Sequence, residues 1–176
     1  MAAEYTLKVK EGDRVPEGTL WHSGNPEDDD ACALPQKFSI SERVKGKKVV
    51  IFSVPASFSP TCSEKHVPGF VEKANDLKSK GIDEVICLSA DTVWSQDAWG
   101  KKLKVGTKVL MASDPYGEFS DKLGLKFETH EGQFRLPMGP RTRRYILLLD
   151  DGIIKYIAVD AAGLEATSAE AVLARL

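Results

Sequence analysis

One cysteine of this 176-residue chain lies where an apolar segment turns into a helix. Cys62 ends the loop of residues 54–62, and the Thr61-x-x-Glu64 spacing predicts a capping box with Thr61 as the N-cap and Cys62 in the first helical position. Unpaired backbone N–H groups and the positive end of the helix dipole favour a thiolate over a thiol at that position. The placement therefore indicates thiol chemistry rather than simple packing.

A nucleophilic role for Cys62 requires a positive charge in addition to the helix end. An ordinary thiol is only a few per cent thiolate near neutral pH, and a helix N-terminus contributes about 1 kcal/mol toward the anion. The basic run of residues 141–144, directly before a predicted strand, offers such a charge. Neighbouring strand residues point to opposite faces, so only one of Arg143 and Arg144 faces a given site, and periodicity does not choose between them.

Ser59 and two prolines complete a candidate pocket around this cysteine. The Ser59 hydroxyl, three residues before Cys62, can donate a hydrogen bond to an anionic or peroxide oxygen near the sulfur. Pro55 and Pro60 remove backbone N–H groups and stiffen the loop. Together with an arginine, these groups suit attack of a thiolate on an O–O bond, where charge develops on the leaving oxygen. The product is a sulfenic acid, which a further thiol must remove.

Two other residues of reactive type have simpler explanations. His66 shares a helical face with Cys62 and has the chemistry of a general base, but packing or hydrogen bonding is the favoured explanation because an arginine-assisted thiolate needs no base. Cys62 and His66 also fall short of the three or four ligands of a zinc site, so neither a metal nor a cofactor is expected. Cys32 lies in an acidic stretch, and a catalytic role is not expected for it.

Composition predicts one globular domain over residues 1–176. With 42% hydrophobic residues the chain can bury a core, and a net charge of −2 gives no reason to expect a nucleic-acid or membrane partner. The N-terminus lacks the apolar stretch of a secretory signal, so a cytoplasmic protein is expected, or an organellar one if a transit peptide has been removed. Three scattered cysteines, Cys32, Cys62 and Cys87, do not make a disulfide framework.

The elements that must position the pocket follow an α/β pattern. Residues 47–54 are almost continuously apolar, which predicts a central strand buried on both faces. A helix follows Cys62, with an interruption at Pro68 and an end at Gly81, and residues 84–90 form the next strand. This β-α-β unit places Cys62 at the carboxyl end of its first strand, the edge where open α/β sheets place their sites.

The remainder of the chain predicts a second β-α repeat and a closing hairpin. Helices are expected at residues 94–104 and 118–123 and after a capping box at Thr167-x-x-Glu170, and strands at 108–112, 145–149 and 153–159, the last two joined by an Asp-Gly turn. The acidic stretch between Asn25 and Phe38 is predicted to be a solvated loop. This order predicts an α/β, thioredoxin-like fold with a central mixed β-sheet flanked by helices on both faces.

The residues around Cys62 resemble those of the peroxiredoxins. Pro55-x-x-x-Ser59-x-x-Cys62 is similar to the P-x-x-x-T/S-x-x-C signature of that family, and FSPTCSEKHVPGF is similar to its atypical subgroup of peroxiredoxin 5 and plant type II enzymes. The resemblance covers nearly the whole chain from about residue 47 onward. It implies a thiol-dependent peroxidase acting on hydrogen peroxide and organic hydroperoxides, with Cys62 as the peroxidatic cysteine. Pro55, Ser59 and Arg144 complete the implied site, because the family has an arginine before an aromatic strand residue.

Departures from the family pattern concern access and the second thiol. Ala56-Ser57 stands where Gly-Ala is usual, and residues 88–91 read Leu-Ser-Ala-Asp where L/F-S-V-N-D is usual. Residues 165–168 lack the resolving cysteine of the animal-type members. Cys87 has the spacing of the second cysteine of plant type II members, which makes it the candidate resolving thiol. A buried, inert cysteine in mid-strand is an equal alternative.

The resemblance also implies partners. The expected reductant is glutaredoxin with glutathione, or thioredoxin, and the expected assembly is a homodimer, with Trp94 and Trp99 as core or interface aromatics. The competing hypothesis is a thioredoxin-like redox sensor or binding module, in which Cys62 becomes oxidised without efficient turnover.

Overall fold

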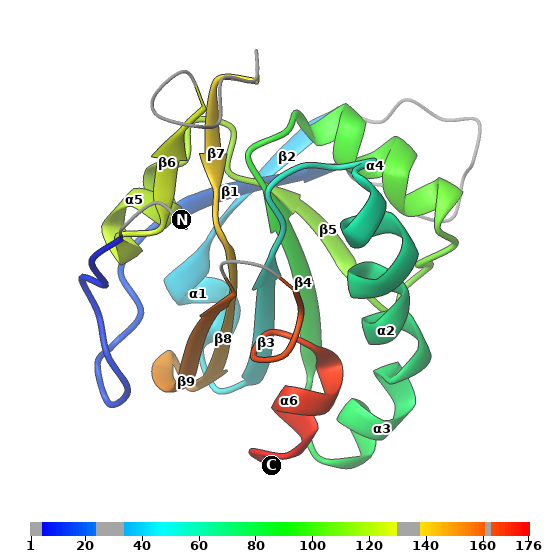
Figure 1. The fold of residues 1–176 in the computed structure, drawn as a ribbon. Helices are drawn as coiled ribbons and strands as arrows, with labels where there is room; N and C mark the ends of the chain where they lie inside the picture. Colours follow the sequence, from blue (N-terminus) through cyan, green and yellow to red (C-terminus); the bar gives the residue numbers. More distant parts are fainter. Residues whose placement is uncertain (1–4, 24–33, 130–137, 161–162) are drawn as a thin grey trace.

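A mixed seven-stranded sheet forms the centre of the part of the chain that the computed structural model describes, which is residues 5–23, 34–129, 138–160 and 163–176. Its strand order is β2-β1-β5-β4-β3-β8-β9 (Figure 1). The strands are β1 (Thr19–Ser23), β2 (Pro35–Ser39), β3 (Lys48–Ser53), β4 (Glu84–Ser89), β5 (Leu110–Ser113), β8 (Arg144–Asp150) and β9 (Ile153–Asp160). A separate pair consists of β6 (Lys126–Glu128) and β7 (Pro140–Thr142).

The middle of the sheet follows the predicted β-α-β unit. Strands β3, β4 and β5 run parallel to one another, and β8 pairs antiparallel with β3. Every residue of β3 after Lys48 is buried, because the strand has neighbours on both edges and helices on both faces. The prediction of a central strand at this position is confirmed.

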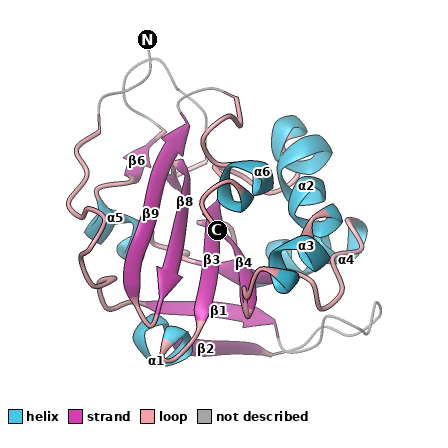
Figure 2. Cartoon of the chain, turned by 90° about the horizontal axis from the view of Figure 1, so that it is seen from below, coloured by secondary structure: helices cyan, strands magenta, loops and turns pink. Residues whose placement is uncertain are grey.

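Helices cover both faces of the sheet (Figure 2). One face carries the π-helical segment η1 (Cys62–His66) and helices α2 (Val67–Glu72), α3 (Ala74–Ser79), α4 (Val93–Lys102) and α6 (Ala169–Leu173), and the other carries α1 (Ile40–Val44) and α5 (Glu118–Leu123). Alternate strand residues feed the two cores: Phe52 packs with Phe70 and Trp99, whereas Ile51 packs with Ile40 and Phe119. The predicted fold class is confirmed.

The closing hairpin also forms as predicted. Asp151 and Gly152 connect β8 to β9 with φ angles of +48° and +76°. Positive φ at both central residues is the geometry of a type I′ turn, whose twist matches that of the flanking strands. The antiparallel strand β8 is thereby returned along β3, and its first residue lies at the carboxyl edge of that strand.

Three local predictions are wrong. Residues 60 and 61 are already helical and Thr61 makes no capping bond, because Pro60 suits the first helical position, where no N–H is needed. The cap of α6 is Ser168 rather than Thr167, since the Ser168 Oγ accepts the N–H of Ala171 at 3.1 Å. The segment between Asn25 and Phe38, expected to be a solvated loop, ends in β2, which pairs with β1. Residues 24–33, which include Cys32 and most of this segment, lie outside the described residues.

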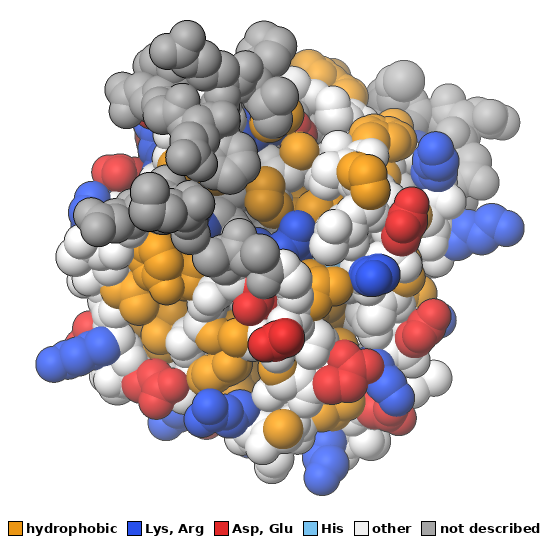
Figure 3. Space-filling view, viewed as in Figure 1, with side chains coloured by type: hydrophobic (Ala, Val, Ile, Leu, Met, Phe, Trp, Pro, Cys, Tyr) orange, Lys and Arg blue, Asp and Glu red, His pale blue; other side chains and the backbone are white. Residues whose placement is uncertain are grey.

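The described surface is mixed in charge. Acidic and basic side chains are interspersed over the described part of the face in Figure 3, without a large area of one sign. Among the described residues, no helix combines the length and the apolar character that spanning a membrane requires.

Candidate active site

Cys62 lies in the first helical turn after β3, at the carboxyl edge of the parallel strands. Its side chain is 1% exposed. The turn is wider than an α-helical one, because the N–H of Val67 donates to the Cys62 carbonyl five residues earlier. Pro68 lies in the first turn of α2, which starts at Val67, and it cannot donate a backbone hydrogen bond to the preceding turn. The π-helical turn directly before α2 accommodates the proline. The predicted interruption at Pro68 is therefore present.

Arg144 provides the positive charge that the cysteine requires. Its Nη2 donates to the Cys62 Sγ at 3.3 Å. The strand register explains this contact: Tyr145 lies opposite Ser53 at the end of β3, so Arg144 is placed just beyond that end. The guanidinium of Arg143 instead lies over the ring of Tyr5, 5.1 Å from its centroid. Of the two arginines that periodicity could not separate, Arg144 is the one against the sulfur.

His66 holds the other side of this arginine. Its Nδ1 accepts from Arg144 Nη1 at 2.8 Å, and its Nε2 donates to the Thr167 carbonyl at 2.9 Å. The tautomer follows, because arginine only donates and a carbonyl only accepts. Burial lowers the pKa of His66 to about 4, and the charge of Arg144 acts in the same direction. The favoured explanation of His66 as a packed, hydrogen-bonded residue agrees with this geometry.

The C-terminal segment supports the histidine from a distance in sequence. Asp160, at the end of β9, accepts the Thr167 N–H at 2.9 Å and the Thr167 hydroxyl at 2.7 Å. The Tyr156 hydroxyl donates to the neighbouring Ala166 carbonyl at 3.0 Å. These bonds fix the carbonyl that His66 binds. The Thr167 hydroxyl, predicted to cap a helix, thus serves the site instead.

Ser59 and Pro55 lie in the loop that leads from β3 to Cys62. The Ser59 hydroxyl donates to the Ala56 carbonyl at 2.9 Å, and the Ser59 carbonyl accepts the N–H of Ser63 at 2.9 Å, which starts the helix. Pro55 is half-buried. The Ser59 hydroxyl proton is bonded to the Ala56 carbonyl, so the Ser59 oxygen is available to accept a hydrogen bond from a peroxide O–H. To donate to the peroxide, Ser59 must first break its hydrogen bond to Ala56.

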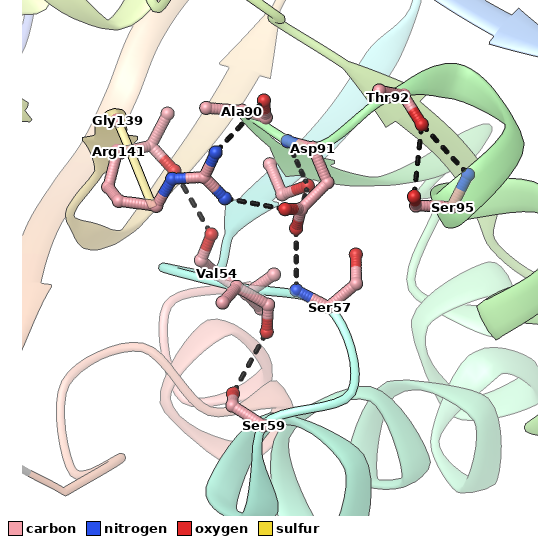
Figure 4. Close-up of polar contacts among 12 residues, drawn as sticks. Val54, Ser57, Ser59, Ala90, Asp91, Thr92, Ser95, Gly139 and Arg141 are labelled. Atoms are coloured by element: carbon pink, nitrogen blue, oxygen red, sulfur yellow. Dashed lines mark hydrogen bonds and ion pairs between the residues drawn. The ribbon is translucent and has the colours of Figure 1, made fainter. Parts of the chain in front are cut away.

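An ion pair beside this loop was missed by the sequence reasoning. Asp91 follows β4, and its carboxylate accepts the N–H of Ser57 at 2.6 Å and pairs with Arg141 Nη1 of β7 at 2.5 Å (Figure 4). Burial alone would raise the pKa of Asp91, but the bonds from Ser57 and Arg141 outweigh it and hold the pKa below its usual range. The signals in the sequence were the departure of residues 88–91 from the family pattern and the basic run of residues 141–144, which contains Arg141.

Cys87 is buried in the middle of β4, opposite Phe52 of β3. Burial raises the pKa of the Cys87 thiol well above its usual value, and nearby Cys62 and Asp91 add to the effect. Cys87 is therefore protonated near neutral pH. Both described cysteines are free thiols.

Comparison with known proteins shows which sequences and folds the chain is similar to. The sequence profile of the Redoxin family matches residues 10–173. Peroxiredoxin-2B of Arabidopsis thaliana is 42% identical over 152 residues, which are 86% of this chain and 88% of the relative. Chloroplastic Peroxiredoxin-2E of the same plant is 39% identical over 158 residues, and the match covers 90% of this chain but only 64% of the relative's length. Among solved structures, reduced Prx3 of Vibrio vulnificus in complex with hydrogen peroxide is 32% identical with a TM-score of 0.82, covering 94% of this chain and 98% of that one.

Proposed function

The chain belongs to the peroxiredoxins of the Redoxin family and is therefore a thiol-dependent peroxidase, and we propose that Cys62 is its peroxidatic cysteine. The observation that carries this assignment is the 3.3 Å hydrogen bond from Arg144 Nη2 to the Cys62 sulfur. A guanidinium in that position stabilises a thiolate. Ser59 and Pro55, in the loop before the helix, complete the proposed site.

The reaction follows from the groups around the sulfur. The Cys62 thiolate attacks one oxygen of the hydroperoxide, so that an S–O bond forms and the O–O bond breaks. The leaving oxygen departs as an alkoxide or hydroxide and takes a proton from solvent. Arg144 stabilises the negative charge as it moves from sulfur to oxygen, and the Ser59 oxygen accepts the hydrogen bond of the peroxide O–H. The sulfur is oxidised to sulfenic acid and the peroxide is reduced to alcohol or water.

A thiol from another molecule restores Cys62 in our proposal. Cys87 lies in mid-strand with a raised pKa, which makes it a poor nucleophile toward the sulfenic acid. A glutathione thiol, with glutaredoxin, or a thioredoxin thiol instead attacks the sulfur and releases water. A second thiol attacks the mixed disulfide, so Cys62 returns to thiolate and two external thiols become one disulfide.

A homodimer in the cytoplasm is the proposed form of the protein. Trp99 is fully buried and belongs to the core, but Trp94 is 55% exposed and Tyr116 is 72% exposed. Both lie beyond the carboxyl ends of parallel strands, at the same edge as the Cys62 loop. Large aromatic side chains at one edge favour association of two copies.

Two neighbouring arginines allow a sharp test of the site. We expect Cys62→Ser to lose peroxide consumption in the presence of glutathione with glutaredoxin and of thioredoxin. We expect Arg144→Gln to lower the rate of Cys62 oxidation by hydrogen peroxide on the order of a hundredfold, because one charged donor at a developing charge is removed. Arg143→Gln is the matched control and keeps the rate, since Arg143 lies over Tyr5 and not against the sulfur.

The outcomes separate the proposed function from its alternative. Wild-type protein that consumes hydroperoxide no faster than Cys62→Ser contradicts the assignment of Cys62. Oxidation of Cys62 without turnover by either reductant system supports the redox sensor instead. Equal losses in Arg143→Gln and Arg144→Gln contradict the role of Arg144.

A further inference from the structure

The Asp91 carboxylate joins three separate segments beside the cysteine loop. Figure 4 shows the Ser57 N–H and the Arg141 guanidinium converging on it. The Ser57 N–H reaches Oδ2 at 2.6 Å and Arg141 Nη1 reaches Oδ1 at 2.5 Å, while Ser89 donates to Oδ2 at 3.0 Å from the end of β4. The backbone carbonyl of Asp91 accepts the Ser113 hydroxyl at the end of β5. The carboxylate is thus fixed to the sheet and in turn holds the loop.

The loop that Asp91 holds contains a strained residue. Phe58 has a φ of +60°, a conformation that a bulky side chain adopts only when its surroundings impose it. Ser57, held by Asp91, lies directly before it, and Ser59, whose hydroxyl is bound to Ala56, lies directly after it. These two anchors impose the turn at Phe58. They also fix Ser59 and the helix start that carries Cys62.

Arg141 connects the same carboxylate to the strand that delivers Arg144. Its Nε donates to the Pro140 carbonyl of its own strand at 2.8 Å, and its Nη2 donates to the Ala90 carbonyl, directly before Asp91, at 3.4 Å. The hydroxyl of Thr142, the next residue, donates to the carbonyl of Val54 at 3.0 Å. Val54 is the first residue of the loop that ends at Cys62. The segment that leads into Arg144 is therefore attached to the loop on both sides.

Burial makes this ion pair different from a surface one. The side chains of Arg141 and Asp91 are 10% and 19% exposed. Removal of one partner leaves a desolvated charge opposite it, so the two are coupled strongly. The pair lies at the carboxyl edge of the sheet, outside both apolar clusters, and its bonds run to the Cys62 loop, to β7 and to the ends of β4 and β5.

We propose that Asp91 and Arg141 form a positioning pair for peroxide reduction, which holds the loop of residues 55–59 and the strand before Arg144 in one relation around Cys62. The proposal rests on the proposed function of Cys62. Neither residue touches the sulfur or the peroxide in this scheme. Both act through Ser59 and Arg144, whose placement decides whether a bound peroxide meets its hydrogen-bonding partners.

The test compares two reactions of the same sulfur. Reaction with hydrogen peroxide needs Ser59 and Arg144 in place around the O–O bond, whereas alkylation by iodoacetamide needs only an accessible thiolate. Both rates are measured in single turnover, with mass spectrometry of the Cys62 peptide as readout. We expect Asp91→Ala to lower the ratio of the peroxide rate to the alkylation rate by about tenfold or more. Asp91→Asn keeps an acceptor for the Ser57 N–H and is expected to recover part of that loss.

Glu84→Gln is the matched control. Glu84 begins β4, is also 19% exposed, and pairs with Arg43 at 2.5 Å, far from the loop at the other end of the strand. Glu84→Gln breaks a comparable ion pair and causes a comparable loss of stability. The ratio of the peroxide rate to the alkylation rate should nevertheless stay unchanged in this variant. A ratio within about twofold of wild type in both Asp91 variants overturns the proposal, as does an equal fall in Glu84→Gln.

Two further results complete the test. If Asp91→Ala does not fold, the same ratio of rates is measured in Asp91→Asn and Arg141→Gln. The double variant Asp91→Asn/Arg141→Gln must lower this ratio no further than the more affected single variant does, because both residues act through one contact. Peroxide reaction at a residue other than Cys62 in the wild-type protein refutes the proposed function itself. Normal Cys62 oxidation that is indifferent to Asp91 refutes only the positioning pair.

Discussion

At the scale of single residues, the Cys62 sulfur is placed by a relay of hydrogen bonds that ends in the backbone of the C-terminal segment. The Thr167 carbonyl accepts from His66, His66 accepts from Arg144, and Arg144 donates to the sulfur. A second proton on the imidazole, at Nδ1, would point at an N–H group of Arg144. Two donors would then face each other, and two positive charges would repel. The relay therefore requires a neutral histidine, in agreement with its lowered pKa.

This requirement predicts a pH-dependent stability. The pKa of His66 is about 4 in the folded protein and 6.5 when unperturbed. Between these two pH values His66 is therefore protonated in the unfolded chain and neutral in the folded protein. The free energy of unfolding should thus fall as the pH is lowered from 6.5 to about 4, and the His66 contribution amounts to about 3 kcal/mol. Urea unfolding of wild type and His66→Gln over this range measures it.

The comparison isolates the histidine from other titrating groups. Burial raises the pKa of Asp114, which makes the free energy of unfolding rise as the pH is lowered, opposite to the effect of His66. Asp114 is present in both proteins, so its contribution cancels when their free energies of unfolding are subtracted. The unfolding free energies of the two proteins should converge as the pH falls. Parallel pH profiles for wild type and His66→Gln would show that the histidine is not held neutral by the fold.

At the scale of elements, the long apolar segments were predictable and the caps were not. Strands β3 and β4 and the β8–β9 hairpin have near-continuous apolar sequence and a clear turn, so they were found within a few residues. Strands β1 and β2 are short, with several half-exposed residues. They are held by tertiary pairing, because β1 pairs with β2 on one side and with β5 on the other. A hydroxyl such as that of Thr167 chooses its partner from the tertiary structure, here Asp160, which local spacing does not contain.

In the candidate site, too, the residues that are close in sequence were predictable and the contacts between distant residues were not. Pro55, Ser59 and Cys62 are close in sequence and form a local signature. Arg144 lies 82 residues from Cys62, and periodicity left it equivalent to Arg143. Only the resemblance to the peroxiredoxins favoured Arg144, and the register of β8 against β3 gives the physical reason for its contact with the sulfur. Asp91 and Arg141 are 50 residues apart, so neither suggested the other in the sequence.

Strand β4 makes a prediction about the second cysteine. Cys87 pairs with Phe52 on one side and Met111 on the other. We therefore expect a bond to Cys62 to form only if the first turn of the Cys62 helix unwinds. A disulfide needs Cα atoms within about 7 Å and aligned side chains. We expect peroxide-treated protein without reductant to contain Cys62 sulfenic acid and no Cys62–Cys87 disulfide. Mass spectrometry of the digested, alkylated protein measures this.

Turnover provides the complementary measurement. Cys87→Ser should retain peroxidase turnover within about twofold in the glutathione with glutaredoxin system or with thioredoxin, because a small buried side chain is replaced without loss of a reacting group. A Cys62–Cys87 disulfide in the wild type, together with loss of turnover in Cys87→Ser, would assign Cys87 as the resolving thiol and require the helix to unwind.

At the scale of the whole molecule, exposed aromatic residues gather beyond the carboxyl ends of the parallel strands. Phe58 follows β3, Trp94 follows β4 and Tyr116 follows β5, and all three are at least half exposed. The edge that carries the reactive sulfur therefore also carries apolar surface that a monomer would leave in water. Association of two copies through this edge would cover that surface next to the Cys62 loop.

This arrangement predicts that charge at the aromatic edge weakens the dimer. Trp94→Lys and Tyr116→Lys each place an ammonium group where an aromatic ring would be buried between copies, and its desolvation opposes association. In sedimentation velocity at micromolar concentration we expect wild type to migrate as a dimer and both variants to shift toward the monomer. Leu176→Lys is the control: Leu176 is 39% exposed at the C-terminus, away from that edge, and the variant should migrate as wild type does. A monomeric wild type refutes the homodimer, whereas a dimer that tolerates both substitutions places its interface on another face.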